Sequence, residues 1–441
     1  MIIAINNKRD NFIIKIIYFF AALYPITPDY FRLFGFPVQF LETILAVFLL
    51  FILSGFKYPI IKGKKVNRVF YSTMAWAIAM IAIYLLHGST YALYSIFIPW
   101  IVLFPYLIKY INTKDKFLKV IDILIMCGFI VAVLAIIDEI TGINVFWYLN
   151  NSGTDIYIHE ARIGIARVYS FSSHPNSYSL YCVFIEALIF YRLFCTSLVK
   201  KVFYKISYVL VFMAACCTAS RSSILLLVLV QVILLWFCGY KRFLRYLFYG
   251  LLGIFVMVFI ISLIAPGLFD SINRIFILTM AVFSDSYAEQ LRALGYQWTT
   301  NGVADRFILW NIIFSKMGGH YLFGYGPSTL LEGVKLVNSL GVSNEKTSIE
   351  VQFLLVLYRY GIFVAITEEM RNIIQFSVGF KNRKIMGPWE NKLGFNKLCF
   401  IVFASYFLML FTLNQTDTVR IYMIMSAMFL SYNYHMSKGV M

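Results

Sequence analysis

Long apolar runs recur along the whole chain, and they constrain its fold more than any other feature. Several reach about 18 residues or more, the length that a helix needs to cross a lipid bilayer. Hydrophobic residues make up 61% of the 441-residue chain and charged residues only 13%, whereas soluble domains are about 45–50% apolar and about 25% charged. We therefore expect an all-α polytopic membrane protein, and we exclude a soluble enzyme and a disordered chain.

About twelve segments have the length and composition of membrane helices. The first carries Lys15 and the seventh is short for a span, so about eleven or twelve spans are expected. No internal repeat and no linker is visible, which predicts a single membrane domain over residues 1–441. The expected spans are 12–28, 36–55, 69–87, 91–108, 118–137, 175–194, 206–219, 222–239, 246–264, 349–367, 397–413 and 420–434.

The net charge of +17 arises from lysines and arginines in short loops between apolar runs. This distribution is typical of cytoplasmic loops in membrane proteins, so it predicts contact with a lipid bilayer and no nucleic-acid partner. It also predicts that both termini are cytoplasmic. Two longer loops then lie outside: residues 138–174 between spans five and six, and residues 265–348 between spans nine and ten. We expect the second loop to be large and mainly helical.

Basic residues on the predicted outer side are mostly arginines, which the topology rule does not require. Arginine suits planar, two-pronged contacts with phosphate or carboxylate groups. Two alternatives remain for each arginine: an ion pair with an acidic loop residue, or a contact with lipid head groups. As a set they favour an anionic ligand on the outer face. The residues are Arg32, Arg162, Arg167, Arg221, Arg274, Arg292, Arg306 and Arg420.

The polar segment from Arg167 to Ser177 enters span six. Pro175 suits the first turn of a helix, so the exposed N–H groups of that turn would face outward and could bind an anion. Arg167 and Asn176 are candidate ligands of such an anion. His174 is a candidate general base or proton shuttle, although it could equally be an interfacial helix cap.

The turn Thr218-Ala219-Ser220-Arg221 separates two apolar runs at the outer surface. An arginine between membrane helices is costly without a partner. A phosphate would be such a partner, and the alternative is that the side chain reaches the interface at a helix end.

The long outer loop contains Asp305 and Arg306 at the expected start of an amphipathic helix, with Asp305 near the N-cap. Downstream, Gly324 and Gly326 would let the backbone turn tightly or approach a ligand. His320 between these elements is expected to be structural. Four aromatic residues of this loop suit either stacking on sugars or the core of the loop itself. They are Trp298, Trp310, Tyr321 and Tyr325.

Acidic residues near span ten are the remaining candidates for proton transfer. Glu350 enters the span and either complements the helix dipole or acts as a catalytic carboxylate, and Glu345 precedes it. Glu42, Glu186 and Asp122 lie in or beside other spans and are expected to be packing or gating partners near the inner half or the core. No phosphate-binding loop, zinc motif or outward carboxylate cluster is present, so no cofactor and no metal is expected.

The order of these motifs resembles the O-antigen ligase / Wzy-type polymerase superfamily. An arginine precedes SSHPNSYS at a span start, SRSS forms the next outer turn, DRFILW and HYLFGYGPS lie in the long loop, and LYRYGI lies in the following helix. The resemblance covers roughly residues 165–365.

The resemblance implies a helical membrane glycosyltransferase of GT-C type that acts at the outer face of the bacterial cytoplasmic membrane. Its donor would be a glycan on undecaprenyl pyrophosphate, used for lipopolysaccharide or capsule, and no divalent metal would be needed. The matching arginines, which would hold the pyrophosphate, are Arg167, Arg221 and Arg306.

Two branches of the superfamily remain open. Ligases pass the finished glycan to lipid A–core and carry a His-Asn pair after the long loop, where this chain reads NEKTSIEVQ. The missing histidine favours an O-antigen or capsule repeat-unit polymerase, for which a chain-length regulator is a compatible partner. It also leaves Glu345, Glu350 or His174 as the base. A lipid-linked oligosaccharide flippase is the rival of another class, but no repeats are visible.

Overall fold

The computed structural model is built almost entirely of helices, and the strands within the part that it describes form two short antiparallel hairpins, β1–β2 and β3–β4. The structure describes residues 2–61, 64–91, 93–151, 167–195, 201–218, 220–264, 270, 273–274, 276–277, 280, 284–293, 302–331, 335–337, 343–345, 349, 351–391, 393–410 and 418–437.

The elements follow one another in this order, with η marking helices that are not α-helical. They are α1 (Ile2–Leu23), β1 (Arg32–Leu33), β2 (Phe36–Pro37), α2 (Val38–Leu53), α3 (Lys64–Leu86), η1 (Leu93–Leu103), α4 (Phe104–Tyr110), α5 (Lys114–Thr141), η2 (Val145–Leu149), α6 (Pro175–Cys195), α7 (Lys201–Cys217), α8 (Arg221–Phe237), α9 (Tyr240–Ile264), α11 (Asp285–Ala293), α12 (Gly302–Met317), η3 (Gly318–His320), β3 (Lys335–Val337), β4 (Ser343–Glu345), α13 (Gln352–Asn382), α14 (Phe395–Met409) and α15 (Thr418–Met436).

Every segment that the sequence predicts to span the membrane falls on a helix. The predicted fourth span corresponds to a π-helical stretch, η1, that continues into α4. Within the described residues, three helices are long and apolar enough to cross a bilayer, and they lie in α3, α5 and α6; five shorter apolar helices accompany them. The helical architecture of a membrane protein is confirmed, whereas the number of spans and the GT-C fold type stay predictions.

Helices α6 and α15 form the centre of the bundle. Nearly all described side chains of α6 are buried, and α15 is buried along almost its whole length. Helices α5, α7, α8 and α14 pack against α6, while α3 and α4 pack against α15. Large apolar side chains such as Phe48 on α2 and Phe259 on α9 remain exposed. Extensive apolar exposure marks a surface that is covered by another phase or molecule, here the lipid.

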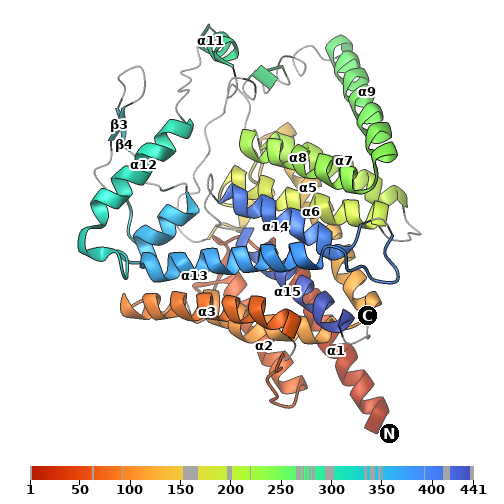
Figure 1. Ribbon diagram of the computed structural model, residues 1–441, viewed down its shortest axis with the longest axis vertical. Helices are drawn as coiled ribbons and strands as arrows, with labels where there is room; N and C mark the ends of the chain where they lie inside the picture. The colour runs from red at the N-terminus through yellow and green to blue at the C-terminus, as the bar shows by residue number, and fades with distance from the viewer. Residues whose placement is uncertain are drawn as a thin grey trace.

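Contacts between sequence-distant helix ends identify the two ends of the bundle. At one end of the bundle the Gln352 N–H donates to the Leu410 carbonyl over 2.9 Å. At the other end the Ser431 hydroxyl donates to the Ile111 carbonyl over 2.5 Å. Figure 1 shows α12 and the β3–β4 hairpin at the left of the bundle, and the start of α1 and the end of α15 at the right. The predicted outer motifs therefore lie away from the termini; which end faces the cytoplasm stays a prediction.

Helices α3 and α13 lie side by side (Figure 1) and enclose a fully buried arginine, Arg371. Its guanidinium carbon lies 4.1 Å from the ring centre of Trp76 and 5.4 Å from that of Trp100. The ring of Tyr422 lies 5.2 Å away, and Glu368 Oε1 lies 4.0 Å from Nη2. Aromatic faces and a carboxylate offset the cost of removing the cation from water.

Three boundary expectations require correction. The first span was expected at 12–28, but α1 ends at Leu23 because Pro25 and Pro28 follow and disfavour a continued helix. Helix α12 begins at Gly302, so Asp305 lies three residues into the helix and not at the N-cap. Glu42 lies near the start of α2 and accepts from Thr27 over 2.7 Å, so it lies at the end of the bundle that is predicted to face outward and not near the inner half.

Candidate functional site

The polar segment before α6 and the turn before α8 are in direct contact. The Val168 N–H donates to the Cys217 carbonyl at the end of α7, over 3.2 Å. Pro175 occupies the first position of α6, as its fixed φ and missing N–H predict. Helix α8 begins three residues after Thr218, with Ser220 as its N-cap. Two sequence motifs separated by a whole helix hairpin therefore form one site.

Asn176 connects these two motifs through its side-chain oxygen. Oδ1 accepts a hydrogen bond from the Ser220 hydroxyl over 2.6 Å and one from Arg167 Nη2 over 3.4 Å. Arg167 Nε also donates to the Thr218 carbonyl over 3.4 Å. The guanidinium is thus held between α6 and the turn before α8, while its side chain remains half-buried. Both candidate ligands therefore lie in direct contact, while their binding of an anion stays a prediction.

His174 caps helix α6. Its Nδ1 accepts the Asn176 backbone N–H over 3.1 Å, and its carbonyl accepts the N–H groups of Ser177 and Tyr178 over 3.1 and 3.2 Å. An imidazole that accepts at Nδ1 carries its proton on Nε2 when it is neutral. In this arrangement the neutral ring can only donate at Nε2. It can accept a proton, and so act as a base, only if Nδ1 gives up its hydrogen bond from the Asn176 N–H.

Positive electrostatic potential concentrates at this site. The N-terminal ends of α6 and α8 meet here through the Asn176–Ser220 contact, and each contributes the positive end of a helix dipole. Arg167 adds a full charge beside them. Burial, with a further contribution from Asp138, raises the pKa of the neighbouring Tyr169 phenol, so this group stays protonated at neutral pH. An anion is the ligand that such an arrangement favours.

The segment Tyr321–Gly326 closes around a break in α13. Gly361 has φ +80° and ψ 178°, which interrupts the helix. The carbonyls of Tyr358 and Arg359 therefore lose their helical donors and accept instead from the N–H groups of Tyr325 and Gly326, both over 2.9 Å. The outer loop and α13 are joined as one unit.

Gly324 and Gly326, which were expected to allow a tight turn or a close approach, both have a positive φ, +68° and +110°. A Cβ on Gly324 would lie 2.4 Å from the backbone of Arg359, and one on Gly326 would lie 3.2 Å from the His87 ring. The close approach therefore serves the packing of the loop on the bundle. A contact of these glycines with substrate stays a prediction.

Two of the aromatic candidates of the long loop, Trp310 and Tyr325, pack against other aromatic rings of the protein. Trp310 stacks on Phe353 of α13 with ring centres 5.4 Å apart. The Tyr325 ring stacks on His320 at 4.2 Å, and its hydroxyl donates to the Lys316 carbonyl. This arrangement agrees with the structural role expected for His320. Tyr321 is exposed, and its hydroxyl donates to the Phe314 carbonyl over 2.6 Å. Trp298 lies outside the described residues.

The other predicted site residues are placed only in part. Arg221 is the first residue of α8, Arg292 lies in α11, Arg306 lies in α12 and Glu345 ends β4, and in each case the description covers the backbone but not the side chain. Arg162 and Glu350 lie outside the described residues. Because Trp310 joins α12 to the start of α13, the helix that carries Arg306 lies at the same end of the bundle as Arg167.

Sequence reasoning did not assign the side chains that hold the site together. The hydroxyl of Ser220 and the carbonyl of Thr218 belong to the SRSS turn, but nothing in that motif identified their partner as the α6 segment. Sequence reasoning also gave no role to Arg359, whose Nε donates to the Thr329 carbonyl over 3.1 Å. A polar residue just after a helix-initiating proline was the available signal for Asn176.

Two comparisons with known proteins bear on this site. Residues 206–367 match the family model described as O-antigen ligase. This segment includes α8, α12, the Tyr321–Gly326 loop and the break in α13, but it begins after Arg167 and Asn176. A search of the curated proteins finds no match to the chain.

Proposed function

We propose that this member of the O-antigen ligase / Wzy-type superfamily is a repeat-unit polymerase that builds O-antigen or capsular polysaccharide. It would join oligosaccharide units carried on undecaprenyl pyrophosphate, at the outer face of a bacterial cytoplasmic membrane. The family match and the apolar helices support a multi-pass membrane enzyme that handles lipid-linked polysaccharide. The choice of polymerase, the polyprenyl carrier and the orientation are parts of the proposal.

The observation that carries the proposal is the convergence of Arg167 with two helix N-termini at Asn176 and Ser220. A pyrophosphate leaving group gains negative charge as its bond to the sugar breaks. Fixed cations and helix N-termini near that group stabilise the transition state more than the ground state. Arg221 and Arg306, at the same end of the bundle, complete the proposed clamp.

The reaction is a glycosyl transfer. A hydroxyl oxygen of the incoming unit forms a bond to the anomeric carbon of the growing chain, and the bond from that carbon to the pyrophosphate oxygen breaks with both electrons. The hydroxyl proton passes to a base and undecaprenyl pyrophosphate leaves. The arginine clamp provides the charge stabilisation of this step from the chain's own residues.

The roles of the proton-transfer candidates follow from the cap geometry. With Nδ1 accepting from Asn176, a neutral His174 presents a donor at Nε2. His174 is therefore better suited to donate a hydrogen bond to the leaving group. In the proposal Glu350 or Glu345 takes the hydroxyl proton, since carboxylates are competent general bases. A chain-length regulator is the partner that a polymerase of this kind would use.

A ligase is the second candidate, because the matching family model is described as O-antigen ligase. Both enzymes use the same donor and differ in the acceptor: a second lipid-linked unit for the polymerase and lipid A–core for the ligase. An outer-face arginine clamp serves either reaction. The identity of the accumulating intermediate distinguishes them.

The test is deletion of the gene in its host, followed by gel analysis of the surface polysaccharide. In a host that makes lipopolysaccharide, loss of the ladder with one repeat left on lipid A–core supports the polymerase. Polymer retained on the lipid carrier identifies a ligase, and single units held at the inner face identify a flippase; either result overturns the proposal.

Complementation then tests the clamp. Wild type and Arg32→Ala should restore the ladder, since the Arg32 side chain is exposed at the same end of the bundle. Arg167→Ala and Arg306→Ala should not restore it at equal protein levels. A full ladder from either clamp variant would remove that residue from the mechanism.

A further inference from the structure

A polar cavity, separate from the arginine site, lies at the predicted outer end of the bundle, outside residues 206–367. Its volume is about 110 Å³, whereas one water needs about 10–15 Å³. It is formed where the end of α1, the start of α2, the start of η1 and the start of α15 meet. The cavity can therefore accommodate a hydroxyl-rich group of several atoms.

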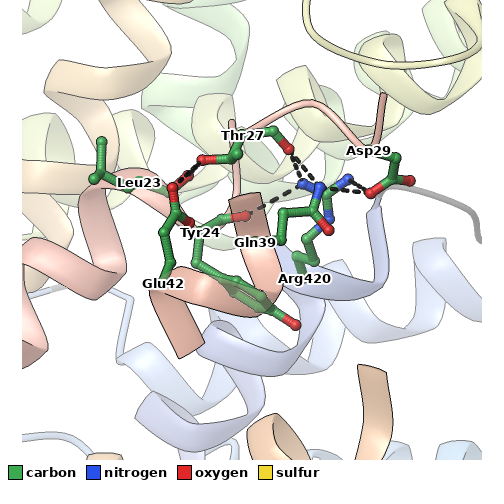
Figure 2. Close-up of polar contacts among 7 residues, drawn as sticks. All are labelled: Leu23, Tyr24, Thr27, Asp29, Gln39, Glu42 and Arg420. Carbon is green, nitrogen blue, oxygen red and sulfur yellow. Dashed lines mark hydrogen bonds and ion pairs between the residues drawn. The ribbon is translucent and has the colours of Figure 1, made fainter. Parts of the chain in front are cut away.

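A hydrogen-bonded cluster forms one wall of this cavity, and Figure 2 shows it. Arg420, whose side chain is 4% exposed, donates through Nη2 to Asp29 Oδ1 over 2.9 Å. Its Nη1 donates to the Thr27 carbonyl and to the Tyr24 carbonyl. Gln39 Nε2 donates to the same Thr27 carbonyl over 2.6 Å and to Asp29 Oδ1 over 2.5 Å. The guanidinium of Arg420, the carboxylate of Asp29 and the amide of Gln39 are thus fixed relative to one another.

This fixed geometry leaves acceptor atoms at the cavity. Both contacts of Gln39 Nε2 are oxygens, so the orientation of its amide is determined, and its oxygen has no hydrogen bond to the described part of the chain. Asp29 is half-exposed and lines the same cavity. The amide oxygen of Gln39 can accept a hydrogen bond from a ligand hydroxyl group.

Aromatic rings supply the remaining walls. Tyr24, Phe40 and Tyr91 line the cavity, and the hydroxyl of Ser95 lies beside them. Aromatic faces bind the C–H faces of a sugar ring, while carboxylate and amide groups bind its hydroxyls in pairs. Arg420 and Asp29 compensate each other's charge, which favours a neutral ligand over a phosphate. This feature distinguishes the cavity from the arginine clamp.

A chain of aromatic contacts connects the cavity with the family-matching segment. The Tyr91 ring stacks on Tyr84 with centres 6.0 Å apart. The Tyr84 hydroxyl lies 3.0 Å from the Tyr360 hydroxyl, next to the break in α13 at Gly361. A ligand in the cavity would lie on the same side of the bundle as the outer loop.

We propose that this cavity, centred on Gln39, Asp29, Arg420 and Tyr91, binds a neutral sugar residue of the lipid-linked glycan and helps to select the repeat unit. The proposal rests on the proposed function for the identity of the glycan. Since the cavity lies outside the matching segment, it is a place where sugar specificity can differ between chains that share the same chemistry.

The test uses the full-length protein purified in nanodiscs. The probe is the oligosaccharide repeat unit released from the host's surface polysaccharide by mild acid, with inorganic pyrophosphate as a second probe. Gln39→Leu and Tyr91→Ala should each weaken binding of the oligosaccharide roughly five- to tenfold, the effect of losing about one hydrogen bond or ring contact. Their binding of pyrophosphate should equal that of wild type.

Two control variants make the result specific. Tyr71→Ala removes another exposed tyrosine, on α3, away from the cavity, and it should bind the oligosaccharide as wild type does. Arg167→Ala should weaken pyrophosphate binding and leave oligosaccharide binding unchanged. Melting curves of all variants verify that the protein is folded.

Equal oligosaccharide binding by wild type, Gln39→Leu and Tyr91→Ala would overturn the inference, as would the absence of oligosaccharide binding by wild type. Weaker pyrophosphate binding by Gln39→Leu or Tyr91→Ala than by wild type would overturn it too, since that result would identify the cavity as an anion site. The proposed function has its own test: an intact polysaccharide ladder after gene deletion would contradict it, whatever the binding assay shows.

Discussion

The side-chain oxygen of Asn176 lies 2.6 Å from the hydroxyl of Ser220, although the two residues are 44 positions apart in the chain. The contact joins the first turn of α6 to the N-cap of α8 and places the Arg167 guanidinium between them. Neither motif forms this site alone, so changes in either should affect the same activity.

We predict that Asn176→Ala reduces polymer formation about 10- to 100-fold, because a hydrogen bond to a charged group contributes about 1.5–3 kcal/mol. The protein should accumulate normally, since Asn176 is only half-buried. Thr141→Ala, which removes a hydroxyl bonded within its own helix α5, is the matched control. The measurement is ladder intensity at equal protein level; a full ladder from Asn176→Ala would show that Arg167 needs no such support.

The helices were predictable because apolar runs of bilayer length leave few alternatives to a helix. The contact between Asn176 and Ser220 was not, because it depends on how α6, α7 and α8 pack. The break at Gly361 was also hidden, since a glycine within an apolar run does not reveal a positive φ. It exists because Tyr325 and Gly326 replace the missing helical donors, and sequence spacing does not encode that replacement.

We predict that Gly361→Ala and Gly324→Ala destabilise the protein, whereas Gly319→Ala does not. A Cβ at Gly361 would lie 2.2 Å from the Leu322 carbonyl oxygen, while one at Gly319 meets nothing within 4 Å. The positive φ alone costs about 1–2 kcal/mol for an L-residue. Melting temperatures in detergent measure this effect. Equal values for all three variants would contradict the close packing of the Tyr321–Gly326 segment against the break in α13.

Arg371→Met should destabilise the bundle by about 3–5 kcal/mol, the usual cost of breaking a buried ion pair by removing one partner. It would leave Glu368 buried beside Trp76 without its cation. The double variant Arg371→Met/Glu368→Gln should recover part of the loss. Arg383→Met, at a half-buried position directly after α13, serves as the control. If the double variant recovers no stability, the loss in Arg371→Met comes from the aromatic contacts of Arg371 and not from its ion pair with Glu368.

Glu390 should make stability depend on pH. Burial raises the pKa of this carboxyl above its ordinary 4.5, and hydrogen bonds from Tyr191 and Tyr432 offset part of the rise. Between the ordinary and the raised pKa the folded state binds more protons than the unfolded state, so its contribution to stability is present below about pH 4.5 and is lost as pH rises through the raised value.

Glu390→Gln removes that titration. Its melting temperature should therefore fall less between about pH 5 and pH 8 than that of wild type, whatever its absolute value. Asp10→Asn, which replaces a carboxyl near the start of α1, is the control. Parallel pH profiles for wild type and Glu390→Gln would contradict the prediction.

The most direct test of the central claim is a polymerisation assay with purified protein in proteoliposomes, supplied with lipid-linked repeat units extracted from the deletion strain. Wild type and Arg32→Ala should release undecaprenyl pyrophosphate and extend the glycan in steps of one repeat, while Arg167→Ala should not. No extension by wild type, together with glycan transfer once lipid A–core is added, would contradict the polymerase account and identify a ligase.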